Sequence, residues 1–146
     1  MDFLSIPEIR FFLQLILAAV LGMIIGVERE YIGKAAGMRT FALVSLGSTL
    51  FTILSREGFS MVGGTFDPSR IAAAIVVGVG FLGAGIIIFR GSHIEGLTTA
   101  ATLWATAAIG MSIGCGLYTL SLIVTFIIIA ILIIIKKIKI EKIKKE

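Results

Sequence analysis

Residues 97–135 read LTTAATLWATAAIGMSIGCGLYTLSLIVTFIIIAILIII, and this stretch of 39 residues contains no formally charged side chain. As one straight α-helix it would be about 58 Å long, whereas the hydrocarbon core of a bilayer is roughly 30 Å thick. The stretch therefore has to fold back once. The sequence Gly114-Cys115-Gly116 is the natural turn, so we predict two membrane spans, 97–113 and 117–135.

The rest of the chain has the same character. Its 146 residues are 58% hydrophobic and 15% charged, with a mean hydropathy of +1.08, whereas soluble domains carry about a quarter charged residues. Three more apolar stretches predict spans at 9–27, 40–55 and 71–89. Because every backbone polar group inside lipid needs an internal partner, we expect helices. The predicted fold is all-α: a polytopic membrane domain of about five helices over 1–135, followed by a basic tail, 136–146.

The basic residues predict the orientation of these spans. With the C-terminus in the cytoplasm, ten lysines and arginines lie inside and three lie outside. Cytoplasmic loops carry the excess of Lys and Arg, so we predict an outside N-terminus and a cytoplasmic C-terminus. A four-span topology is the alternative if the last two apolar runs do not both cross. Acidic residues and Arg10 precede the first run, which argues against a cleaved signal peptide.

Small residues recur at helical spacing along several predicted spans. Such stripes let helix backbones approach closely in a membrane, so we interpret them as helix-packing positions. Alternatively, glycines break the third span and expose carbonyl groups to an ion, as broken helices do in transporters. The packing candidates are Gly22, Gly26, Gly78, Gly80, Gly83, Gly85, Thr98, Thr102, Gly110 and Gly114.

Six ionisable residues at the ends of spans are the functional polar candidates: Glu28, Arg29, Glu30, Arg39, Asp67 and Arg70. One interpretation is that they set topology and pair at helix ends. The other is that carboxylates bind or relay a cation, because Mg²⁺ prefers carboxylate oxygens and retained waters. On that second interpretation, Glu28 and Asp67 are the candidate metal ligands. Asp67 is also expected to cap the third helix, with Pro68 in its first turn.

Other classes of function find little support. One cysteine and one histidine exclude an intramolecular disulfide and a multi-His metal site within the chain. No nucleophile–base set or phosphate-cradling loop is present, so we expect no enzyme activity. The net charge of +4 arises from a C-terminal lysine cluster; it favours anionic lipid over nucleic acid. No cofactor other than Mg²⁺ is indicated.

Several blocks, in order and with their spacing over about residues 15–120, resemble the MgtC/SapB family. They are Gly26-Val-Glu-Arg-Glu30, Ala36-Gly-Met-Arg-Thr-Phe-Ala-Leu-Val44, Asp67-Pro-Ser-Arg-Ile-Ala-Ala73, Gly78-Val-Gly-Phe-Leu-Gly-Ala-Gly85 and Gly96-Leu-Thr-Thr-Ala-Ala101. The family's characteristic polar residues fall on the six candidates above. The chain departs from the family pattern at Phe41, Ala74, Val77 and Glu95. The loss of polar groups at Ala74 and Val77 argues against an ion path through the third span.

The resemblance implies a multi-pass protein of the bacterial inner membrane, linked to growth at low magnesium and, in pathogens, to survival inside host cells. It also implies partners among membrane proteins, such as the ATP synthase or a Mg²⁺ transporter. Longer family members carry a soluble C-terminal domain, which we expect this membrane domain to lack.

The leading functional hypothesis is a regulator that acts by helix–helix contact with other membrane proteins. The competing hypothesis is a Mg²⁺ or other cation transporter or channel that works as a homo-oligomer. A purely structural lipid-packing protein would leave the charge clusters without a role.

Overall fold

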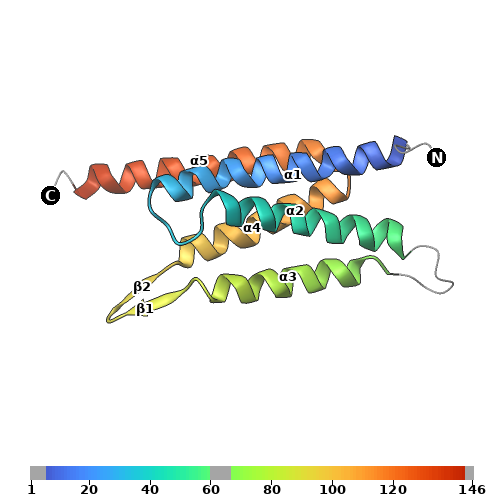
Figure 1. Ribbon diagram of the computed structural model, residues 1–146. Coiled ribbons are helices and arrows are strands. Elements are labelled where there is room, and N and C mark those ends of the chain that lie inside the picture. Colours follow the sequence, from blue (N-terminus) through green and yellow to red (C-terminus); the bar gives the residue numbers. More distant parts are fainter. Residues whose placement is uncertain (1–5, 60–66, 144–146) are drawn as a thin grey trace.

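The computed structural model describes residues 6–59 and 67–143 and shows five antiparallel helices, with the ends of the chain at opposite ends of the bundle (Figure 1). A π-helical segment, Leu54–Gly58, extends the second helix. A short antiparallel hairpin joins the third and fourth. In chain order the elements are α1 (Ile6–Tyr31), α2 (Met38–Ile53), α3 (Ser69–Ala84), β1 (Ile88–Arg90), β2 (His93–Glu95), α4 (Leu97–Gly114) and α5 (Tyr118–Ile143).

By length and composition, three helical stretches are long and apolar enough to cross a membrane: Glu8–Tyr31, Met38–Gly58 and Leu97–Gly114. Ser69–Ala84 and Tyr118–Ile134 are shorter apolar helices. The prediction of an all-α polytopic membrane protein is confirmed. The α5 helix continues through Ile143, into the predicted tail, and residues 144–146 of that tail lie outside the described residues.

The interior of the bundle holds polar as well as apolar side chains, and many large apolar side chains are exposed on its exterior. On α2 the buried face carries Ser45, Ser48, Thr49 and Thr52, while large apolar side chains such as Phe51 are exposed. Lipid provides no hydrophobic driving force between helices, so close packing and interhelical hydrogen bonds hold them together. The arrangement therefore suits a bilayer.

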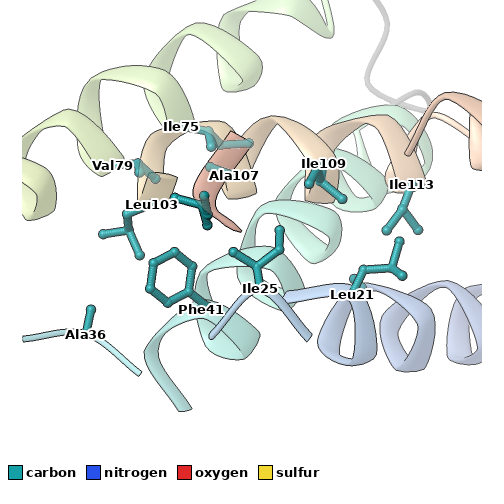
Figure 2. Packing of buried hydrophobic residues seen from close by; sticks show 12 residues of the cluster. Leu21, Ile25, Ala36, Phe41, Ile75, Val79, Leu103, Ala107, Ile109 and Ile113 are labelled. Carbon is teal, nitrogen blue, oxygen red and sulfur yellow. The ribbon is translucent and has the colours of Figure 1, made fainter. Parts of the chain in front are cut away.

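Apolar side chains fill the space where α1, α2 and α4 meet. Phe41 is fully buried and lies between Ile25 of α1 and Leu103 of α4 (Figure 2). Ala107, Ile109 and Ile113 continue the same cluster along α4. The α4 helix packs against all four other helices, whereas α3 lies at the side of the bundle against α4 and α2.

Two helices end at glycines with left-handed backbone conformation. After α1, Gly33 has φ 68°, and the amides of Gly33 and Lys34 donate to the carbonyls of Glu30 and Arg29. After α4, Gly116 has φ 81°, and the amides of Gly116 and Leu117 donate to Ile113 and Ser112. Both are Schellman motifs, which glycine favours because it has no Cβ. The predicted turn at residues 114–116 is confirmed.

The third predicted span, 71–89, is longer than the helix that forms. The α3 helix ends at Ala84, and β1 begins at Ile88 and pairs with β2 in the register Ile88↔Glu95. Gly85 follows the helix directly, and the β-branched run after it favours extended backbone over helix. Hydropathy does not distinguish an apolar strand from an apolar helix, so the boundary was misplaced.

Candidate functional site

Arg29 lies on the last turn of α1 and is only 3% exposed. Its Nη2 donates to Thr99 Oγ1 at 2.9 Å, and its Nη1 lies 3.4 Å from Glu28 Oε2. The Nε of Arg29 is buried and has no hydrogen-bond partner in the part of the chain that the structure describes. Arg29 therefore ties the end of α1 to the start of α4 and leaves one buried donor unsatisfied.

Glu30, one residue further on, organises the turn into α2. Its Oε2 accepts the Met38 amide at 2.9 Å, and its side chain packs on Gly37, where a Cβ would collide with it. Because α2 begins after a glycine, no side chain at that position can satisfy the first amides of the helix. The Glu30 carboxylate accepts the Met38 amide instead. Its negative charge also interacts favourably with the positive end of the helix dipole.

Arg39 is exposed in the first turn of α2, at the same end of the bundle as Arg29. It borders an apolar groove between α2 and α3, whose volume is about 750 Å³. We call this surface the α2–α3 groove. Its lining is Arg39, Thr40, Leu43, Val44, Gly47, Ser48, Phe51, Ile71, Ala74, Ile75, Gly78, Val79 and Leu82.

Asp67 and Arg70 lie at the start of α3, at the opposite end of the bundle from Glu28 (Figure 1). The Asp67 Oδ1 accepts the Ser69 amide at 2.9 Å, so its carboxylate caps the first turn, although Pro68 is the residue directly before the helix. Hydrogen bonds from the Ser69 side chain and amide, together with the charge of Arg70, hold the pKa of Asp67 below its ordinary value. Asp67 therefore stays ionised to lower pH than a free aspartate.

The six polar candidates thus form two separate groups. Glu28, Arg29, Glu30 and Arg39 share one end of the bundle, and Asp67 and Arg70 share the other. Within the described residues, no three His, Cys, Asp or Glu side chains come close enough to hold a metal ion together. A cation bound by Glu28 and one bound by Asp67 would need two independent sites.

The predicted packing residues also fall into two groups, those that are buried in the bundle and those that are exposed. Gly22 and Gly26 lie against the backbone of α2, and Gly110 and Gly114 bring α4 against the same helix. Thr102 is buried and donates to the Thr98 carbonyl, and Gly83 faces Ala100. By contrast, four of the predicted positions are exposed: Gly78, Gly80, Gly85 and Thr98. A Cβ at Gly78 or Gly80 would meet nothing within 4 Å.

Gln14 is a polar residue that the sequence argument missed. It is 2% exposed in α1, and its Nε2 donates to the Ile113 carbonyl at 2.7 Å. Its Oε1 and the Oγ of Ser45 are buried without partners among the described residues. A single glutamine inside an apolar span is a recognisable signal, because polar groups within a membrane are expensive unless they serve packing or function.

The model of the MgtC family matches residues 15–140. The chain belongs to the MgtC family. It is 53% identical over 117 residues to the Escherichia coli K12 protein named "Putative magnesium transporter YhiD", over 77% of this chain and 54% of that protein. It is 46% identical to the MgtC protein of Brucella abortus over 114 residues, which are 78% of this chain and 46% of that protein.

A third relative is the MgtC protein of Salmonella typhimurium, 45% identical over 127 residues that make up 87% of this chain and 53% of that protein. The chain thus spans about half the length of these curated relatives. No solved structure matches the chain significantly.

Proposed function

We propose that this protein is a regulator in the bacterial inner membrane, connected with growth at low magnesium, that acts by contact with other membrane proteins. The connection with magnesium rests on the family and on the name of the YhiD relative. The mode of action rests on the α2–α3 groove.

The groove is shaped to receive a transmembrane helix. Gly47 and Gly78 lie in its lining, and a Cβ on either would meet no other atom within 4 Å. Leu43, Phe51 and Leu82 border these small residues and are well exposed. Small residues flanked by large apolar ones are typical of helix–helix interfaces in membranes, because they allow two backbones to approach.

Arg39, the one charged residue in the lining of the groove, adds a means of choosing a partner. Arg39 is exposed at one end of this surface, in the first turn of α2. Complementary charge there favours a partner with acidic residues at the same depth and disfavours a basic one. The ATP synthase and a Mg²⁺ transporter, the partners that the family resemblance implies, are the first to test.

The test is a photo-crosslinking amino acid at Leu43, in cells starved of magnesium. We expect an adduct with another membrane protein, and we expect Gly78→Leu to lower its yield by about tenfold because the side chain fills the groove. The matched control is Gly80→Leu, on the same helix and equally open but outside the groove. Equal yields in the two variants would refute the proposal, as would adducts formed only with a second copy of the chain.

A second candidate function, cation transport by an oligomer, is favoured by one observation. The buried oxygens Gln14 Oε1 and Ser45 Oγ are unsatisfied among the described residues. Neutral oxygens can serve as ligands of hard cations. If they line a path, replacing Gln14 would abolish ion flux, and this outcome separates the two functions.

A further inference from the structure

We propose that a second cavity, between the end of α1, the hairpin and the start of α4, binds a phosphate-bearing anion. The cavity has a volume of about 800 Å³, and both polar and apolar residues line it. We call it the Arg29 cavity. Its lining is Arg29, Ile32, Gly33, Lys34, Ala35, Ile86, Ile88, Ile94, Glu95, Gly96, Leu97, Thr98, Thr99, Ile131 and Leu132.

Arg29 is the first reason to expect an anion there. A buried guanidinium is costly unless its charge is paired and its donors are satisfied. Its carboxylate neighbour, Glu28, sits at 3.4 Å, which is long for a charge-assisted hydrogen bond, and Nε has no partner among the described residues. Because Arg29 is in the lining, an anion in the cavity would compensate its charge.

The start of α4 is the second reason. Leu97, Thr98 and Thr99 form its first turn, and all three line the cavity. The residue before the helix, Gly96, has φ 91° and offers no side chain as a cap. First-turn amides have no acceptor within their own helix, and the helix dipole places a partial positive charge there. Buried Arg29 and a helix N-terminus thus converge on one space, which is a favourable arrangement for phosphate.

The other charged residues in the lining are Lys34 and Glu95. Lys34 is exposed, and the Schellman motif at the end of α1 fixes its backbone beside Arg29. Glu95 is exposed and lies 3.6 Å from the exposed Arg90, so solvent screens its charge. Two of the three charged residues in the lining, Arg29 and Lys34, are thus basic.

The apolar residues of the lining bear on the kind of ligand. They include Ile32, Ile86, Ile131 and Leu132, which come from three separate segments. Such a lining is suited to the first part of an acyl chain. The shared chemistry is a phosphate group, which either the headgroup of an anionic phospholipid or free inorganic phosphate supplies.

The test uses the purified full chain in dodecyl maltoside micelles, which contain no phosphate. One arm adds a minor fraction of phosphatidylglycerol and measures the lipid that the protein retains, by native mass spectrometry. The other arm omits it and titrates inorganic phosphate by calorimetry. We expect binding in at least one arm, which identifies the source. Lys34→Gln should weaken binding about fivefold, and Arg29→Gln about tenfold or more.

The matched control is Arg39→Gln, which removes the same charge at the same end of the bundle but outside the Arg29 cavity. It should leave binding unchanged. Because Lys34 is exposed, its variant tests the cavity even if Arg29→Gln fails to fold. The proposal is overturned if neither phosphate source binds, or if Lys34→Gln and Arg39→Gln weaken binding equally. None of these readouts depends on a protein partner, so the regulatory proposal stands or falls separately.

Discussion

Replacing Gly110 with leucine is expected to separate α2 from α4 and to cost the bundle about 3 kcal/mol or more of its free energy of unfolding. A Cβ at this position would overlap the Ser45 carbonyl oxygen. The clash is with backbone, so a rotamer change cannot relieve it. The hydrogen bond from Thr49 Oγ1 to the Gly110 carbonyl, 2.7 Å long, would also be lost.

The measurement is unfolding of the purified protein in mixed micelles, followed by circular dichroism. Ala108→Leu is the control, because Ala108 lies on the same helix and is exposed. That variant should unfold like the parent. If Gly110→Leu also unfolds like the parent, the close approach of α2 and α4 in this structure is wrong.

Replacing Phe41 with alanine is expected to lower the free energy of unfolding by about 3–5 kcal/mol, the range found for large core side chains. Phe41 is fully buried between α1 and α4 (Figure 2). Its removal leaves a cavity whose lining loses van der Waals contacts, and these contacts are the main cohesive force between helices in lipid.

The control is Phe51→Ala, on the same helix, where the side chain is 54% exposed. It should change stability by less than about 1 kcal/mol, because lipid or detergent replaces the lost contacts. The same micelle titration measures both variants. Equal effects would mean that Phe41 does not occupy the interior position described above.

The sequence was most informative where one local rule decides the structure. The turn at Gly114-Cys115-Gly116 follows from bilayer thickness, and a left-handed Gly116 closes it. The packing of Gly22, Gly26, Gly110 and Gly114 follows from their spacing of four residues. Spacing alone places residues on one face of a helix. It does not say which faces meet a neighbouring helix. Spacing therefore did not distinguish the packed glycines from Gly78 and Gly80, which are open within the chain.

The contacts in the polar region depend on tertiary structure and could not be predicted from the sequence. Arg29 was a candidate because it lies at the end of a span, but its partner Thr99 is 70 residues away. The division of the carboxylates between the two ends of the bundle follows from topology, because Glu28 lies near the end of α1 and Asp67 lies just before α3. Gln14 could have been found, since it is a single amide inside an apolar run.

The most direct test of a regulatory function is Mg²⁺ flux into proteoliposomes that contain the purified protein, with and without a membrane potential, beside empty liposomes. Folding is checked on the same purified preparation, before reconstitution, by the unfolding assay described for Gly110, and insertion is checked by resistance to alkaline extraction from the liposomes. The regulator account predicts no flux above the empty liposomes under either condition. Saturable flux that disappears in Gln14→Leu protein, with its folding intact, would contradict that account and identify the protein as a transporter.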